Sequence, residues 1–251
     1  MTHIGEQAYQ SLGETSTGLT VLSPGNVSVV GRPANTDRRV YFACKRVLDV
    51  VLALMFLLFV SPVMLVIACL IRMDSPGPIL FRQVRVGLGG RRFVFYKFRT
   101  MYDGCDPEVH RKYVESLMRN PVPEDASVAQ QGARLYKLCN DRRVTRIGHT
   151  LRRASLDELP QLVNVLKGEM SLVGPRPALP YEVNAYKEWH KGRLTTLPGM
   201  TGWWQVRGRC ELTFDEMVRL DLEYIARQSL WFDLKILVRT VPAVISRRGA
   251  A

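Results

Sequence analysis

The sequence contains little cysteine, with only five such residues among 251. Their number is odd, their positions are widely scattered, and no two have the spacing of a metal site or a redox motif. This pattern excludes a small disulfide framework and predicts reduced thiols in a reducing compartment. The residues are Cys44, Cys69, Cys105, Cys139 and Cys210.

Acidic residues are scarce relative to basic ones. The chain has 23 Asp and Glu against 35 Lys and Arg, which gives a formal net charge of +12 and an isoelectric point near 9.8. Such an excess requires an anionic partner or surface, and nucleic acid, anionic lipid and phosphorylated substrates all satisfy it. No recognition helix or aromatic and basic binding motif stands out, so we expect no nucleic acid partner.

A secretory signal is missing, because the first 36 residues lack a basic start followed by an apolar run. They are rich in Gly, Ser, Thr, Pro and Asn without periodicity, and we predict a disordered tail over residues 1–40. The single long hydrophobic run follows. Residues 50–71 carry no charge over 22 positions. As a helix they would measure about 33 Å, the length of a membrane segment.

The centre of this run carries Ser61 and Pro62. Proline removes a helical hydrogen bond and clashes with the carbonyl group four residues earlier, so we expect a bend there. Five Lys or Arg residues lie on each flank, which favours a re-entrant hairpin with both ends on the cytoplasmic side. A single kinked span fits the residues equally well. The cations after the run, expected near an anionic leaflet, are Arg72, Arg82, Arg85, Arg91 and Arg92.

No second hydrophobic run of similar length follows, so we expect residues 73–251 to form one domain on one side of the membrane. The expected fold class is α/β of the α+β kind, a small mixed domain associated with the membrane. Period-two alternation predicts strands at residues 79–86 and 92–99. Helices are predicted at 107–118, 156–167, 214–225 and 231–245, the last as an interfacial amphipathic helix or a core-facing one, and a loop at 120–131.

Residues Ser155 to Gln161 read Ser-Leu-Asp-Glu-Leu-Pro-Gln and follow two arginines. Ser155 and Glu158 have the spacing of a helix-capping box, which is a purely structural interpretation. Alternatively, one of the adjacent carboxylates is a nucleophile and the other a metal ligand, a division of roles suited to phosphoryl transfer. The residues alone leave both interpretations open.

Three further segments present cations. Lys97 and Arg99 lie two residues apart, so in a strand both side chains project from one face. That face would contact either a phosphate or simply solvent. Arg176 lies between two prolines, which restrict its backbone. This arrangement either positions the guanidinium group for a ligand or simply forms a rigid turn. Residues 198–209 combine glycines, two tryptophans and two arginines, which suits a nucleotide or diphosphate, or a tight strand and bend.

The motifs occur in this order after one predicted membrane segment. Together they resemble those of the bacterial sugar transferases that start glycan assembly on polyprenyl phosphate, the monotopic phosphoglycosyl transferases. The chain looks most like the undecaprenyl-phosphate hexose-1-phosphate transferases that start exopolysaccharide synthesis, over roughly residues 43–246. Cys210 is a departure, because many relatives have Asn after the Gly-Arg pair. The carrying motifs are Lys45-Arg46-x-x-Asp49, Ser61-Pro62, Lys97-Phe98-Arg99-Thr100-Met101, Ser155 to Gln161, Gly168 to Pro177 and Pro198 to Arg209.

The resemblance implies an enzyme that transfers a sugar-1-phosphate, galactose or glucose favoured, from a UDP-sugar to undecaprenyl phosphate with release of UMP. This reaction is the first step of exopolysaccharide, capsule or O-antigen assembly. Asp157 is implied as the nucleophile that forms a covalent phosphosugar, and Glu158 as a catalytic ligand of Mg²⁺. The positions implied to bind the substrate phosphates are Lys97, Arg99, Arg152, Arg176 and Arg209.

The resemblance also implies a location. Residues 41–72 would enter the bacterial inner membrane as a re-entrant helix broken at Ser61 and Pro62, with a catalytic domain, residues 73–251, on the cytoplasmic face. Anionic membrane lipid is then a third expected partner. Two other classes stay open on the residues: a nucleic-acid-binding protein, and a non-catalytic membrane scaffold held by anionic lipid at about 1 kcal/mol per cation.

Overall fold

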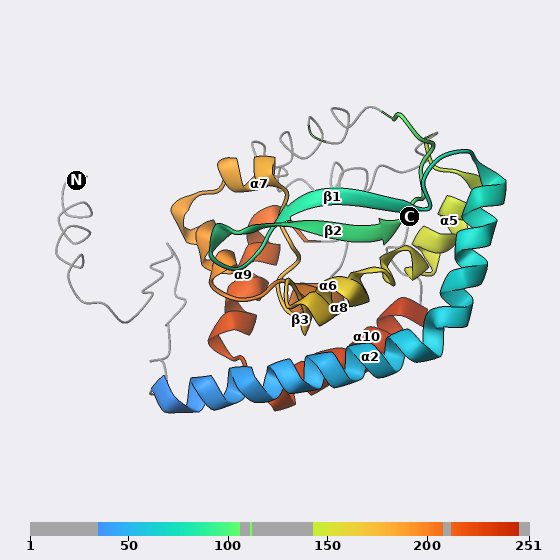
Figure 1. Cartoon of the computed structure of the whole chain (residues 1–251). Helices are drawn as coiled ribbons and strands as arrows, with labels where there is room; N and C mark the ends of the chain where they lie inside the picture. The colour runs from blue at the N-terminus through green and yellow to red at the C-terminus, as the bar shows by residue number, and fades with distance from the viewer. Residues whose placement is uncertain (1–34, 106–110, 112–142, 208–211, 246–251) are drawn as a thin grey trace.

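The computed structural model describes residues 35–105, 111, 143–207 and 212–245. Figure 1 shows a bent N-terminal helix bordering a mixed domain, which agrees with the predicted fold class. In the described part, β1 pairs with β2 in antiparallel fashion and β3 with β4 in parallel fashion. The elements are α2 (Asn35–Asp74), β1 (Leu80–Val86), η1 (Leu88–Gly90), β2 (Arg92–Phe98), α5 (Arg146–Arg153), η2 (Leu156–Glu158), α6 (Gln161–Lys167), β3 (Ser171–Val173), α7 (Pro180–Asn184), η3 (Glu188–Thr195), β4 (Gly199–Thr201), α8 (Trp203–Arg207), α9 (Phe214–Ala226) and α10 (Leu230–Ile245).

Helix α2 is continuous but sharply bent. Figure 1 shows a long first limb and a shorter second limb that meet at a corner and do not fold back on each other. Pro62 lies inside the helix and has no N–H to donate, and Ser61 Oγ donates to the Leu58 carbonyl at 2.9 Å. The Ser-Pro pair therefore accounts for the bend that the sequence predicts in this helix.

Most of α2 faces away from the domain. Its most apolar 18-residue window has a mean hydropathy of 3.0, and 17% of that window is buried, so the helix is long and apolar enough to cross a membrane. The buried residues Ala53, Val60, Ile67 and Ile71 recur at heptad-like spacing and share one side of the helix. That side packs on the domain and leaves the remaining apolar side chains exposed, Phe59 at 81% among them.

The core beneath α2 comes from the β1–β2 hairpin and α6. The hairpin register runs from Leu80 opposite Phe98 to Val86 opposite Arg92. Phe95 and Phe98 are buried in one cluster with residues of α6 and the buried side of α2. The strands predicted at residues 79–86 and 92–99 are confirmed to within one residue at each end.

The predicted helix over residues 156–167 is wrong as a single element. It is divided into η2 and α6, with Leu159 and Pro160 between them. Helices predicted at 214–225 and 231–245 are confirmed as α9 and α10 with ends shifted by at most one residue. Nearly all of the predicted tail at 1–40 and helix at 107–118, and the whole loop at 120–131, lie outside the described residues.

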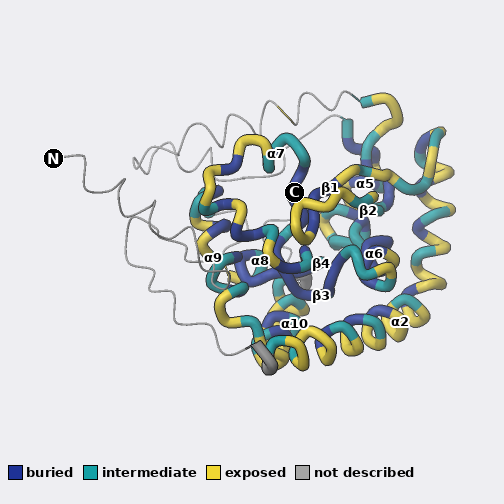
Figure 2. Tube along the Cα trace, turned by 60° about the vertical axis from the view of Figure 1, so that its left-hand side comes forward, coloured by how far each residue is buried: buried dark blue, intermediate teal, exposed yellow. Residues whose placement is uncertain are grey.

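Helix α10 lies beside the first limb of α2 (Figures 1 and 2). Its inner side contributes Ile236, which is fully buried in a cluster with Val173, Trp203 and Tyr224. Its outer side exposes apolar residues, with Trp231 at 76%. The two helices thus present an adjacent pair of apolar surfaces, coloured as exposed along the lower edge of Figure 2.

Candidate active site

The carboxylate pair lies on the short turn η2 between α5 and α6. Ser155, just before η2, has φ 55° and ψ 20°, a left-handed conformation that L side chains seldom adopt. Its side chain makes no capping hydrogen bond, so the capping-box interpretation is wrong. The left-handed residue instead redirects the chain, and the turn leaves Asp157 8% exposed with Glu158 at the wall of a pocket.

Helix α5 is fixed against the end of β2. Thr145 caps the helix by accepting a hydrogen bond from the Gly148 N–H at 3.0 Å. A side chain at Gly148 would collide with the Thr100 carbonyl group, so only glycine permits this close approach. Arg152 Nε also donates to Thr100 Oγ1 at 2.9 Å. These contacts hold η2 next to the strand that carries Lys97.

Lys97 lies within a cluster of charges. Burial lowers the pKa of Lys97 to about 8; the Asp157 carboxylate opposes this shift, while Arg152, Arg85 and Arg176 reinforce it. Charges act on a pKa in this way only when they are close. The structure therefore brings together four of the side chains singled out in the sequence, Lys97, Arg152, Asp157 and Arg176.

Arg85 is a fifth member that sequence reasoning missed. We expected it near an anionic leaflet, but it is buried at 6% exposure, so that expectation is wrong. Its Nη1 donates to the Pro177 carbonyl at 3.0 Å, and its guanidinium carbon lies 5.2 Å from the centre of the Phe95 ring. Burial and the neighbouring Arg176 lower the pKa of Arg85 to about 10.

The hairpin register contained the missing signal. Phe81 pairs with Lys97, and Arg85 lies four residues after Phe81 on the same strand. Residues two and four apart on a strand share a face, so Arg85 lies on the hairpin face of Lys97. Because Arg85 follows the hydrophobic run closely in the sequence, we assigned it to the membrane surface and not to the site.

Arg99 is engaged elsewhere. It is 4% exposed, and its guanidinium group donates to the Ser75 and Pro76 carbonyls at 2.7 and 2.5 Å and to Ser75 Oγ at 3.0 Å. These acceptors follow α2, so Arg99 fixes the connection from α2 to β1. The Arg99 guanidinium group is thus held by protein carbonyl groups, although the β1–β2 pairing continues to its own backbone, where the Arg99 N–H donates to the Ile79 carbonyl at 2.9 Å. Arg209 lies outside the described residues.

A small pocket opens beside Glu158. Two guanidinium groups, those of Arg85 and Arg176, line it together with the Glu158 carboxylate. The lining residues come from β1, β2, η2, α6, β4, α8 and the segment that follows β3. The other lining residues are Phe95, Gln161, Pro177, Gly199, Met200 and Gln205.

In the part of the chain that the structure describes, Glu158 could hold a metal ion only together with ligands from outside the protein. In the described ranges, no three or more His, Cys, Asp or Glu side chains gather as a metal-binding group. Structural zinc needs such a set, whereas Mg²⁺ is held by one or two carboxylates together with substrate phosphates and water. A carboxylate pair beside two arginines suits an ion shared with a bound diphosphate.

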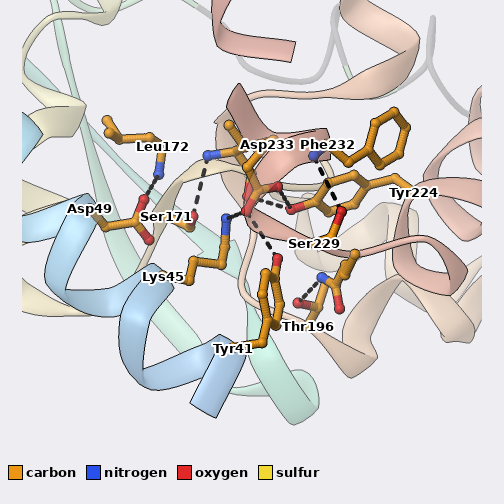
Figure 3. A network of polar contacts seen from close by, with 12 residues as sticks. Tyr41, Lys45, Asp49, Ser171, Leu172, Thr196, Tyr224, Ser229, Phe232 and Asp233 are labelled. Atoms are coloured by element: carbon orange, nitrogen blue, oxygen red, sulfur yellow. Dashed lines mark hydrogen bonds and ion pairs between the residues drawn. The ribbon is translucent and has the colours of Figure 1, made fainter. Parts of the chain in front are cut away.

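A buried polar network anchors the first limb of α2 (Figure 3). Lys45 Nζ lies 2.7 Å from Asp233 Oδ2 on α10, with side-chain exposures of 7% and 10%. The hydroxyl groups of Tyr41 and Tyr224 donate to the same carboxylate at 2.9 and 2.7 Å. Helix α2 is therefore fastened to α10 through charges as well as apolar contacts.

Arg46 and Asp49, which belong to the same Lys45-Arg46-x-x-Asp49 motif, attach α2 to the domain core. Arg46 donates to the carbonyl groups of Val165 and Leu166 at 2.6 and 2.8 Å, in the last turn of α6, where the Val165 carbonyl also accepts from the Gly168 N–H at 3.0 Å. Asp49 Oδ1 accepts from the Leu172 N–H at 3.0 Å, at β3 (Figure 3). Lys45, Arg46 and Asp49 thus set the position of the hydrophobic helix relative to the active site.

A bent apolar helix long enough to cross a membrane and a carboxylate turn close to arginines are the features that a membrane-associated enzyme acting on phosphates would need. The profile of the family described as bacterial sugar transferase matches residues 40–247, and the chain belongs to that family. This agrees with the resemblance found in the motifs.

Several curated proteins are similar to the chain. Galactosyl transferase CpsE of Streptococcus agalactiae is 43% identical over 211 residues, which cover 84% of this chain and 44% of that protein. The UDP-glucose:undecaprenyl-phosphate glucose-1-phosphate transferase of Caulobacter vibrioides is 40% identical over 253 positions, covering 96% and 84%. Exopolysaccharide production protein ExoY of Sinorhizobium fredii is 38% identical over 206 residues, covering 82% and 87%. The chain spans about half the length of CpsE and of some other relatives.

Proposed function

We propose that the protein transfers a sugar-1-phosphate from a UDP-sugar to undecaprenyl phosphate, releases UMP, and thereby starts exopolysaccharide assembly. The observation that carries this proposal is the meeting of the Asp157–Glu158 pair with a cluster of four cations, in a member of the bacterial sugar transferase family. Relatives are named for glucose-1-phosphate and galactose phosphate transfer, so these are the sugars we favour.

Asp157 acts as the nucleophile. One carboxylate oxygen attacks the β-phosphorus of the UDP-sugar, and the bond from that phosphorus to the bridging oxygen breaks, so that UMP leaves with the electron pair. The sugar phosphate is then covalently attached to Asp157 as an acyl phosphate. A phosphate oxygen of undecaprenyl phosphate next attacks the same phosphorus, and the carboxylate of Asp157 departs in its original state.

The cations make the first attack feasible. A carboxylate approaching a diphosphate is repelled unless fixed positive charge neutralises the phosphate oxygens. Lys97, Arg152 and Arg176 supply such charge around Asp157. Arg85 is already held by the Pro177 carbonyl before substrate binds, so little reorganisation is needed.

Glu158 would hold Mg²⁺ together with the phosphates of the donor. When bound, the ion offsets the charge that develops on the departing UMP. The support for this role is that Glu158 lines the pocket it shares with Arg85 and Arg176, next to the nucleophile in the chain.

We infer that α2 enters the cytoplasmic membrane as a re-entrant helix and that the catalytic domain lies on the cytoplasmic face. The corner in α2, its exposed apolar side chains and the balanced basic flanks support this arrangement. Helix α10 would lie at the interface, where anionic lipid attracts basic residues. Such an anchor would bring a lipid-linked acceptor and a soluble UDP-sugar to one site.

The test is UMP release by the detergent-solubilised protein with Mg²⁺, undecaprenyl phosphate and a panel of UDP-sugars. We expect release with one hexose and a loss of about a thousandfold or more in Asp157→Asn. Intact-protein mass spectrometry should show a sugar-phosphate adduct that the variant lacks. Asp103→Asn, which changes an exposed carboxylate after β2, is the matched control. Full release by Asp157→Asn would overturn the nucleophile, and no release with any donor would overturn the function.

A further inference from the structure

The last residue of α2 is bonded to the start of the helix that leads to the carboxylate turn. Asp74 Oδ2 accepts a hydrogen bond from the Ile147 N–H at 3.2 Å, across 73 positions of the chain. Ile147 lies in the first turn of α5, where amide groups have no partner within the helix and the helix dipole favours a carboxylate. Thr145 caps the neighbouring Gly148 amide, so the start of α5 has one local cap and one cap from α2.

Apolar contacts join the same two helices. Figure 1 shows α5 beside the second limb of α2. Ile67 and Ile71 of that limb are buried in one core cluster with Leu151 of α5, and Ile147 packs against this cluster. The second limb of α2 and helix α5 are therefore held together by a hydrogen bond and by a shared core.

A separate set of contacts holds α5 to the segment just after β2. The Thr145 N–H donates to the Thr100 carbonyl at 3.1 Å, and Arg152 Nε donates to Thr100 Oγ1 at 2.9 Å. Strand β2 also carries Lys97, whose pKa responds to Arg152. Helix α5 thus has two attachments, because Thr100 connects it to the cations of the site and Asp74 connects it to the helix proposed to enter the membrane.

The two steps of the proposed reaction make different demands on these attachments. The UDP-sugar is soluble and meets the cations, so the first step depends on how Asp157 lies relative to them. The acceptor phosphate is attached to a lipid, so the second step depends on how Asp157 lies relative to the bilayer. Asp157 follows α5 on the short turn η2, and a misplacement of about 1 Å can reduce a rate about a hundredfold.

We propose that Asp74 is a positioning residue that couples the membrane helix to the nucleophile, because it holds α5 and the carboxylate turn at a fixed depth relative to α2. The inference rests on the proposed function and on the membrane position proposed for α2. Loss of the Asp74 carboxylate leaves α5 attached through Thr100 but releases it from the end of α2. Formation of the sugar-phosphate adduct then continues, whereas transfer of the sugar phosphate to the lipid slows.

The experiment measures the two steps separately in the full chain reconstituted in liposomes. Without acceptor, the UDP-hexose that supports turnover gives a burst of UMP as the adduct forms on Asp157. With undecaprenyl phosphate in the same liposomes, the rate of UMP release per enzyme divided by the fraction of enzyme that carries the adduct, from mass spectrometry, is the rate constant of the second step. In Asp74→Ala we expect this constant to fall about tenfold or more. We expect the burst rate to change less than about twofold.

Three further variants make the comparison specific. Asp74→Asn keeps an acceptor oxygen, and Asn caps helices about as well as Asp, so its second-step constant should stay within about threefold of the unmodified value. Asp103→Ala removes an exposed carboxylate close to Gly77 in the connection after α2 and should leave both steps unchanged. If thermal unfolding shows that Asp74→Ala is misfolded, Asp74→Leu, which keeps the branched shape without an acceptor oxygen, has the same expected result.

The outcomes separate this inference from the proposed function. Equal slowing of both steps would make Asp74 a general support of the fold and overturn the inference, as would no change in either step. An Asp74→Asn protein as slow as Asp74→Ala would exclude the hydrogen bond as the cause and overturn it too. Absence of a UMP burst and of the adduct in the unmodified protein with every UDP-sugar would contradict the proposed function itself.

Discussion

The protonation state of Lys97 sets an upper limit on the pH range of activity, because the surroundings of this residue lower its pKa. Burial lowers its pKa from 10.5 to about 8, so the ammonium form is lost as pH rises through about 8, well before a free lysine would lose it. If Lys97 neutralises a substrate phosphate, kcat/KM for the UDP-sugar falls over that interval. A pH profile of UMP release from about 6.5 to 10 measures this effect.

The Lys97→Arg variant extends that prediction. Arginine stays protonated throughout this interval, so the decline near pH 8 should disappear even if the maximum rate is lower. Lys187→Arg changes an exposed lysine that pairs with Asp215, away from the cluster, and should keep the decline. The same alkaline decline in Lys97→Arg would show that another group is responsible.

At the scale of residues, the sequence singled out Asp157, Glu158 and Arg176 only as candidates, each with a structural alternative, and the structure places Glu158 and Arg176 at one pocket. The burial of Arg85 in the cluster and the engagement of Arg99 elsewhere were not predictable, because they depend on which carbonyl groups the α2–β1 connection and Pro177 make available. Those are consequences of tertiary packing.

At the scale of elements, the attachment of α2 to α10 depends on one buried ion pair. Lys45→Ala would leave the Asp233 carboxylate buried with only two tyrosine hydroxyl groups. We expect a loss of about 3–5 kcal/mol in the free energy of unfolding, measured by thermal or denaturant unfolding in detergent. Replacing both partners, as Lys45→Met with Asp233→Asn, should recover much of that loss because no charge then remains buried.

The matched control for that prediction is Lys235→Ala, an exposed cation on the same helix α10. It should change the free energy of unfolding by about 0.5 kcal/mol or less. If Lys45→Ala were as stable as Lys235→Ala, the ion pair would make no contribution to docking α2.

Periodic patterns predicted most elements because they reflect burial on one side. The alternation in the hairpin and the apolar spacing in α9 and α10 both report which side meets the core. The turn η2 escaped prediction because the spacing of Ser155 and Glu158 matches a capping box, whereas the preceding helix α5 is held to the end of β2 by the contact of Arg152 with Thr100, 52 residues away in the sequence.

For the whole molecule, the apolar surfaces of α2 and α10 predict how the protein sits on a bilayer. Trp231 is 76% exposed on α10, whereas Trp203 and Trp204 are 3% and 7% exposed. In liposomes with brominated lipid, Trp231→Phe should remove about half or more of the fluorescence quenching. Trp189→Phe, a half-buried tryptophan away from that surface, should retain it. Undiminished quenching in Trp231→Phe would mean that α10 does not contact lipid.

The ion pair between α2 and α10 also constrains how the protein is made. Lys45 leaves the ribosome 188 residues before Asp233. At about 5–20 residues per second, the hydrophobic helix waits about 10–40 s for its charged partner. During that interval the helix must be held by the insertion machinery or by lipid alone, with Lys45 still hydrated. Attachment of the hydrophobic helix α2 is therefore completed only after α10 has been synthesised, and chains truncated before Asp233 would lack the charged partner of Lys45.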